Sequence, residues 1–386
     1  MKKSFFVMAI LLTVPAMFIR FGGAHVSHTL EAALFGMAIL GAAFLLSWAA
    51  EVAQKDISQS LAVAILALIA VLPEYAVDLY FAWTAAKDPA YGHYATANMT
   101  GANRLLVGFG WPLIVLIFWF RSKRGTNVRL EHSHRTEIAF LGLATVYSIW
   151  IPLKGRLDLF DTFFLLLIFT WYVVRISGVA HHEPELLGPA KWIGDMPEFR
   201  RRVMAISMFV FSGAVIFLSA ERFAESLVAA GKGWGIDEFL LVQWLAPLAS
   251  EAPEFIVAAI WTWRGDAEAG LGALVSSKVN QWTLLVGTIP LVYSFSLGHV
   301  GALQLDTVQT HELWLTAAQS LFAVAILANL SLSWYGASLL FGLFSLQLVF
   351  AHIRMPVSAV YVVLALLLMF RDRVHYPAVV RALFRN

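Results

Sequence analysis

Long apolar segments alternate with short polar ones along almost the whole chain. Each holds about 20 residues with few charges, which is the length that an α-helix needs to cross the hydrocarbon core of a bilayer. The pattern therefore predicts an all-α polytopic membrane protein with about twelve spans. The predicted spans are residues 4–20, 30–52, 57–86, 92–120, 134–152, 155–176, 200–228, 236–262, 268–296, 311–330, 333–353 and 356–371.

Composition supports the same class of protein. Of 386 residues, 60% are hydrophobic and 13% are charged, against roughly 45–50% and about 25% in soluble domains. The net charge of +2 gives no reason to expect a nucleic-acid partner, and no soluble protein partner is indicated. Because the chain has no cysteine, disulfides and thiolate metal sites are excluded.

Basic residues in the loops predict the orientation. The loop 121–135 carries five arginine and lysine residues, so we expect it on the cytoplasmic side of a bacterial-type plasma membrane. Alternation from this loop places Lys2 and Lys3, residues 200–202 and the basic tail after residue 370 on the same side, with both termini cytoplasmic. The first apolar segment could instead belong to a cleaved signal peptide, because it is short and follows a basic start.

Two distant segments repeat one another. The stretch "PEYAVDLYFAW" at 73–83 returns as "PEFIVAAIWTW" at 253–263, and "LLVG" occurs at 105–108 and again at 284–287. The two copies are five spans apart, so they enter the membrane from opposite sides. Inverted repeats of this kind are typical of secondary transporters, whose binding site lies near the midplane where the repeats meet.

A proline followed by a glutamate, Glu74 or Glu254, opens each copy of the repeat. The proline removes a backbone donor, so we expect each helix to kink at a break there and to free carbonyl groups near 69–71 and 248–251. A carboxylate at membrane depth is costly to bury, and it indicates a functional site by default. The alternative is a protonated glutamate that is hydrogen-bonded to a neighbouring helix.

The second copy resembles a known family of transporters. "GIDEFLLVQWLAPLASEAPEF" followed by "GLGALVSSKVNQWTLLVG" is similar to the second α-repeat of the cation/calcium exchanger superfamily, which includes sodium/calcium and proton-coupled cation exchangers. The resemblance implies inverted five-helix repeats that form a ten-helix core, with one extra helix at each end. It divides the chain into an extra span 1–29, a first half 30–176 with its α-repeat at about 57–120, a cytoplasmic linker 177–199, a second half 200–353 with its α-repeat at about 236–296, and an extra span with a basic tail 354–386.

The resemblance also implies the ion-binding residues. Glu74 and Glu254 match the family's central glutamates, which would bind the transported metal ion. Ser277 matches the serine of the second half-motif, and Gln281 matches its last polar ligand. Alignment on "LLVG" places Asn98 opposite Ser277 in the first copy.

The chain departs from the family pattern just before each glutamate. Positions at which the family has threonine and serine are Ala70 and Val71 in the first copy, and Ser250 and Glu251 in the second. Sodium sites built from those hydroxyl groups would be incomplete. Ser250 and Glu251 remain candidate cation or proton ligands.

Added charges lie near both copies. Lys278 could be a snorkelling lysine, an ion-pair partner of Glu251, or an ammonium that stands where the family holds sodium. Arg104 follows Asn103, which an alternative register places opposite Lys278, so Asn103 and Arg104 are candidates for binding and charge compensation. Asp78 lies one turn past the glutamate of the first copy and could be a proton relay or a pore-mouth charge.

The resemblance and the repeat together predict a secondary-active antiporter for inorganic cations. Calcium exchange for protons or sodium is favoured, with no cofactor besides the transported ions. One alternative is an intramembrane acid–base enzyme that uses Glu251 and Glu254, and another is a non-transporting relative. "HHEPE" at 181–185 could bind a metal ion or could simply be a solvated loop.

Overall fold

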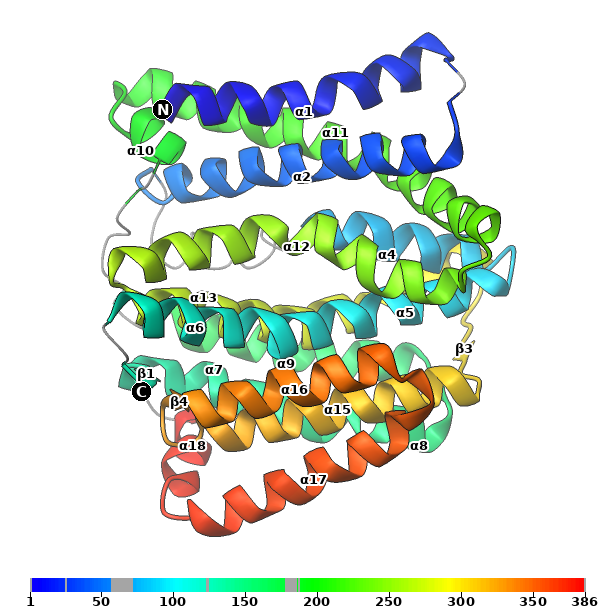
Figure 1. The fold of residues 1–386 in the computed structure, drawn as a ribbon. Helices are drawn as coiled ribbons and strands as arrows, with labels where there is room; N and C mark the ends of the chain where they lie inside the picture. The colour runs from blue at the N-terminus through cyan, green and yellow to red at the C-terminus, as the bar shows by residue number, and fades with distance from the viewer. Residues whose placement is uncertain are drawn as a thin grey trace. The chain divides into compact units, whose positions relative to one another are not determined.

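A computed structural model describes residues 2–24, 26–56, 72–122, 125–177, 186 and 188–384. Helices dominate this part of the chain, as predicted (Figure 1). The α-helices are α1 Lys2–Gly22, α2 His28–Ala53, α4 Leu72–Ala85, α5 Ala90–Leu105, α6 Trp111–Arg121, α7 Arg135–Ser148, α8 Trp150–Lys154, α9 Leu159–Ser177, α10 Gly188–Gly194, α11 Glu198–Trp234, α12 Glu238–Arg264, α13 Ala267–Asn280, α14 Val286–Leu297, α15 Thr307–Leu327, α16 Trp334–Val349, α17 Arg354–Arg371 and α18 Tyr376–Ala382. The short elements are the π-helices η1 Leu106–Gly110 and η3 Gln281–Leu285, the 3-10 helices η2 His132–His134 and η4 Ala351–Ile353, and the strands β1 Asn127–Arg129, β2 Arg156–Leu157, β3 Leu303–Gln304 and β4 Ser331–Ser333.

Every predicted span contains helix in the part of the chain that is described. Seven of these described helical segments are both long and apolar enough to cross a membrane by themselves. One of the seven, residues 90–121, includes a π-helical turn, and the apolar helix α16 is shorter than a full span. The number of membrane crossings stays a prediction.

The helices form two compact units, each built from two stretches of the chain. Unit 1 contains Met1–Phe81 and Ile176–Pro253, and unit 2 contains Ala82–Arg175 and Glu254–Asn386. Each unit contains segments from both halves that the sequence predicts, so the units are not the same as the two repeats. The predicted domain boundaries therefore stay a prediction.

In unit 1, α2 and α11 lie side by side in opposite directions (Figure 1). Arg201 at the start of α11 makes a bidentate contact with Asp56, just after α2, at 2.8 and 2.6 Å. At the other end of the pair, Arg222 donates to Glu31 at 3.2 Å. The hydrogen bonds from Arg201 hold the pKa of the Asp56 carboxyl below its usual value, so this ion pair persists at neutral pH.

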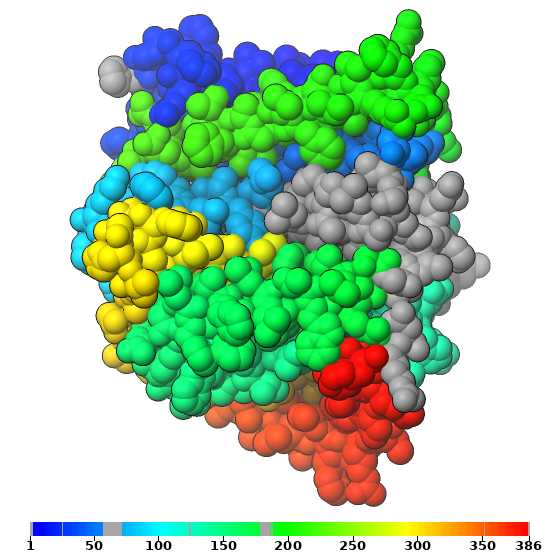
Figure 2. Space-filling view, turned by 180° about the vertical axis from the view of Figure 1, so that it is seen from behind, coloured from blue at the N-terminus to red at the C-terminus, as the bar shows by residue number. Residues whose placement is uncertain are grey.

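In unit 2, two small antiparallel ribbons join loops that are distant in the sequence. Strand β1 pairs with β4, and β2 pairs with β3. The predicted alternation of spans places the loops of each ribbon on one side of the membrane, and the pairings agree with that alternation. The C-terminal segment packs against α9, where Trp171 and Phe384 have ring centroids 5.5 Å apart (Figure 2).

Candidate functional site

The proline–glutamate pair of the second copy lies within an unbroken helix. Helix α12 runs from Glu238 to Arg264 and contains both Pro247 and Pro253. The helix is therefore not interrupted before Glu254, and the predicted kink at this proline stays a prediction. Prolines are tolerated inside membrane helices because neighbouring groups and local adjustments satisfy the freed backbone. The corresponding segment of the first copy, residues 57–71 with Ala70 and Val71, lies outside the described residues.

Unit 1 holds four of the predicted site residues, and all four are buried. Glu74 lies in the first turn of α4, and Asp78 lies one turn further along the same helix face. Ser250 and Glu251 lie on α12. The Ser250 hydroxyl donates to the carbonyls of its own helix at Ala246 and Pro247, both at 3.2 Å, so its oxygen lone pairs stay available as acceptors.

Unit 2 holds Glu254 together with the residues of both second half-motifs. Both carboxylate oxygens of Glu254 are buried, and none of the described residues approaches them at hydrogen-bond geometry. The Ser277 hydroxyl on α13 interacts with this carboxylate at a looser geometry. Asn98 on α5 and Gln281 at the start of η3 are also buried. Carboxylate, hydroxyl and amide oxygens are the ligands that hard cations such as Ca²⁺ prefer.

The second helices of the two copies run antiparallel within unit 2. Near the start of the α5–η1–α6 helix, the Trp83 carbonyl accepts a hydrogen bond from Ser296 at the end of α14, at 2.7 Å. Near its other end, Arg121 Nε donates to the Trp263 carbonyl before α13, at 3.0 Å. These contacts give the two helices opposite directions, as the inverted repeat predicts.

Both second helices contain a π-helical turn near the candidate residues. In the first copy the turn is η1, which includes Gly108 of "LLVG", and in the second it is η3, which begins at Gln281. A π-helical turn leaves part of the regular hydrogen-bond ladder unmatched and is frequently found at functional sites. Nothing in the local sequence pattern predicted these turns.

Lys278 meets the first copy at the middle of this antiparallel pair. Its ammonium donates to the Asn103 side-chain oxygen at 2.7 Å and to the Asn103 carbonyl at 3.1 Å. It also lies 4.5 Å from the centre of the Trp282 ring, a distance typical of a cation–π contact. The lysine is 0% exposed, so it does not snorkel to an aqueous surface. Its predicted ion pair with Glu251 stays a prediction.

Arg104 belongs to a buried charge network that the sequence did not indicate. It forms an ion pair with Glu312 of α15 and donates to the Gln347 side-chain oxygen of α16 at 2.8 Å. Glu312 also pairs with Arg354 of α17 at 2.5 Å. These contacts place the Arg104 charge against α15 and α16, and its predicted role in charge compensation stays a prediction. A signal was nevertheless present in the sequence: an arginine within one predicted span needs a carboxylate partner, and Glu312 lies within another predicted span.

The structure thus assembles the candidate residues as two groups, one in each unit. The predicted meeting of Glu74 and Glu254 at the midplane stays a prediction. The possible metal ligands at 181–185 lie outside the described residues.

Comparisons with known proteins agree with this architecture. The family model described as "Sodium/calcium exchanger protein" matches residues 28–178 and 204–352. The chain is 44% identical to the solved structure of the H⁺/Ca²⁺ exchanger CAX, with a TM-score of 0.96 over 99% of this chain and 97% of that one. The Ca²⁺/H⁺ antiporter protein YfkE has a TM-score of 0.66 at 14% identity, covering 90% of this chain and 98% of its own.

Two further similarities are more distant. The sodium–calcium exchanger NCX_Mj has a TM-score of 0.56 at 15% identity, covering 84% of this chain and 98% of its own, which shows a shared fold. The putative antiporter CaxA of Alkalimonas amylolytica is 24% identical over 91 residues. That match spans 23% of this chain and 28% of the length of the curated relative.

Proposed function

The chain belongs to the sodium/calcium exchanger protein family, and we propose that it is a secondary-active antiporter that exchanges Ca²⁺ for protons across a membrane. The observation that carries this proposal is the similarity over nearly the full length to the H⁺/Ca²⁺ exchanger CAX. The relatives are named as exchangers and antiporters, so the intramembrane enzyme is not favoured.

The buried oxygen ligands support a divalent cation as the substrate. Ca²⁺ takes six to eight oxygen ligands, with carboxylates, amides and hydroxyl groups as frequent contributors. Unit 1 supplies the carboxylates of Glu74 and Glu251, and unit 2 supplies Glu254 with the oxygens of Ser277 and Gln281. In the proposed transport cycle, Glu74 and Glu254 bind the ion together.

Exchange follows from the cost of a buried negative charge. A carboxylate at membrane depth needs either a cation or a proton before the protein can rearrange at low cost. Ca²⁺ and protons would therefore occupy the same glutamates in turn, and each ion would favour the conformation that binds it better. In this proposal the Lys278 ammonium, which donates to Asn103, replaces the additional cation that sodium-coupled relatives would need, so sodium is not required.

A flux assay tests this function directly. Purified protein in Ca²⁺-loaded liposomes should release Ca²⁺ when a proton gradient is applied, and replacing sodium by choline should leave the rate unchanged. Glu254→Gln should abolish proton-driven flux, because the amide cannot alternate between a bound cation and a proton. Retained flux in Glu254→Gln, or strict sodium dependence of the unmodified protein, would contradict the proposal.

A matched substitution on the same helix controls for folding. Glu238 lies in the first turn of α12, well before the buried glutamates. Glu238→Gln should keep both the melting temperature and the flux, because it removes a carboxylate outside the candidate site. Loss of flux in both variants would mean that any charge change on α12 disturbs transport.

The proposed orientation places both termini in the cytoplasm of a bacterial-type cell. Since the chain has no cysteine, single cysteines can report it without background labelling. Lys232→Cys should react with a membrane-impermeant maleimide in intact cells, whereas Arg373→Cys should react only after lysis. The opposite pattern would reverse the orientation.

A further inference from the structure

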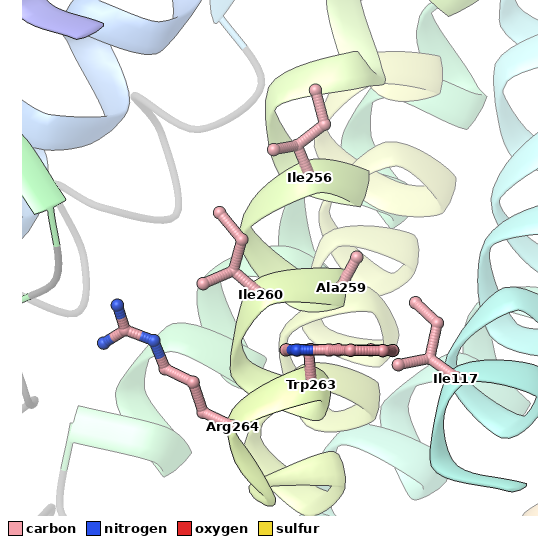
Figure 3. A pocket seen from close by; sticks show the side chains of 6 residues that line it. All are labelled: Ile117, Ile256, Ala259, Ile260, Trp263 and Arg264. Carbon is pink, nitrogen blue, oxygen red and sulfur yellow. The ribbon is translucent and has the colours of Figure 1, made fainter. Parts of the chain in front are cut away.

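An apolar groove of about 320 Å³ lies on unit 2 where α6 and the second half of α12 are neighbours (Figure 3). The residues from α12 are spaced three and four apart, so they share one helix face. The small Ala259 side chain leaves a hollow among larger neighbours. The groove is lined by Ile117, Ile256, Ala259, Ile260, Trp263 and Arg264.

The lining side chains are largely accessible. Ile260 is 42% exposed and Trp263 is 61% exposed. In a membrane protein, an exposed apolar face of this kind contacts hydrocarbon, so an acyl chain suits it chemically. Trp263 lies in the last turn of α12, and tryptophan is enriched where membrane helices reach the headgroup region. The groove therefore extends from the hydrocarbon toward the headgroups.

Arg264 lies at the headgroup end of this groove, and Arg121 lies at the neighbouring end of α6. Arg121 ends α6 and Arg264 ends α12. The hydrogen bond from Arg121 Nε to the Trp263 carbonyl, 3.0 Å long, fixes these two helix ends together. Both arginine side chains are exposed, so each guanidinium can reach a ligand from outside the protein.

The nearest carboxylates in the sequence after Arg264 are already engaged. Asp266 accepts the backbone N–H of Ala269 at 2.9 Å and caps α13. Glu268 pairs with His134 at 2.6 Å. Because Asp266 and Glu268 already bind other groups, an external anion is favoured as the counter-charge for the arginines. Basic clusters at the ends of membrane helices bind anionic lipid headgroups by this electrostatic attraction.

We propose that this groove binds one anionic phospholipid. Its acyl chain lies along Ile256, Ala259 and Ile260, and its phosphate lies beside the Arg264 guanidinium, with Arg121 as a second basic residue at the end of the neighbouring α6. The apolar wall favours a lipid over free phosphate, because a free anion would leave that wall uncovered. A bound lipid would join α6 to α12, the helix that carries Glu254.

Native mass spectrometry of the full-length protein in detergent tests the proposal. The probes are phosphatidylglycerol and phosphatidylcholine with identical acyl chains. One phosphatidylglycerol should stay bound under conditions that remove phosphatidylcholine. Arg264→Gln should lower its retention about fivefold, the effect expected for one basic residue near an anionic lipid. Ala259→Phe should lower it as well, because the ring fills the hollow while both arginines remain.

A matched control comes from another helix end. Arg373 follows α17 and lies 5.7 Å from the Phe370 ring, so it also combines an exposed arginine with an aromatic side chain outside the groove. Arg373→Gln should retain phosphatidylglycerol like the unmodified protein. Equal retention of the two lipids, unchanged retention in both groove variants, or displacement by inorganic phosphate alone would each overturn the proposal.

Discussion

The two helices α5–η1–α6 and α13–η3–α14 are copies of one sequence element, yet they hold their buried cations differently. In the first copy, Arg104 lies against the carboxylate of Glu312, which Arg354 also contacts. In the second copy, Lys278 donates to oxygens of Asn103 on the opposite copy. One cation is joined to α15 and α16, and the other joins the two repeats.

The difference indicates two roles for charges of the same sign. A fully formed ion-pair network costs much to break, because a remaining buried charge would lose its partner. A lysine bound to an amide can change partners at lower cost, and its pKa is more easily shifted than that of arginine. We therefore expect Arg104 to stabilise the fold and Lys278 to influence ion coupling.

The largest expected effect comes from the arginine. Arg104→Met should lower the free energy of unfolding by about 3–5 kcal/mol, because it removes one partner from a buried ion pair. The melting temperature in detergent measures the loss. Arg354→Met should cost less, since the Arg354 side chain is 16% exposed and its guanidinium is partly hydrated. An Arg104→Met variant as stable as the unmodified protein would remove the distinction between the two cations.

A smaller effect should separate the glycines of the two "LLVG" segments. A Cβ added at Gly108 would overlap the ring and Cβ of Phe344 on α16, whereas one added at Gly287 would lie 3.1 Å from Leu165 Cβ. We expect Gly108→Ala to destabilise the protein by about 1–3 kcal/mol through overpacking. Gly287→Ala should be nearly neutral, because the gain in helix propensity offsets the tight contact. Equal melting temperatures for the two variants would show that the copies pack alike.

The predictable part of the fold is the part that the bilayer imposes. Apolar runs of about 20 residues and basic loops specify helices and their alternation, because unpaired backbone groups are too costly in hydrocarbon. The inverted direction of the two second helices followed from an odd number of intervening spans, and the contacts of Arg121 and Ser296 confirm it.

The remainder depends on partners that a local pattern does not select. Glu312 lies near the start of its predicted span, where a carboxylate is ordinary, and only the packing of α15 on α5 makes it the partner of Arg104. The π-helical turns likewise have no residue signature. Helix α12 is not interrupted at Pro253, because a membrane helix can accommodate a proline without ending.

A small change in stability is also expected for Lys278→Met. Methionine has a similar length, and removal of a buried ammonium also removes the cost of its desolvation, which offsets the lost hydrogen bonds to Asn103. We expect a change of about 1 kcal/mol or less in the free energy of unfolding. The melting temperature in detergent should therefore stay close to that of the unmodified protein, in contrast to Arg104→Met.

Transport should nevertheless change in the Lys278→Met variant if, as proposed, the ammonium bound to Asn103 replaces the cation that sodium-coupled relatives need. We expect loss of proton-driven Ca²⁺ flux or the appearance of sodium dependence, measured in liposomes with sodium or choline outside. Lys278→Arg is the matched control, since it keeps the charge and can still donate to Asn103. If Lys278→Met transports like the unmodified protein, the lysine only stabilises the contact between the repeats. If it unfolds instead, Lys278 resembles Arg104, and the two copies hold their cations for the same structural purpose.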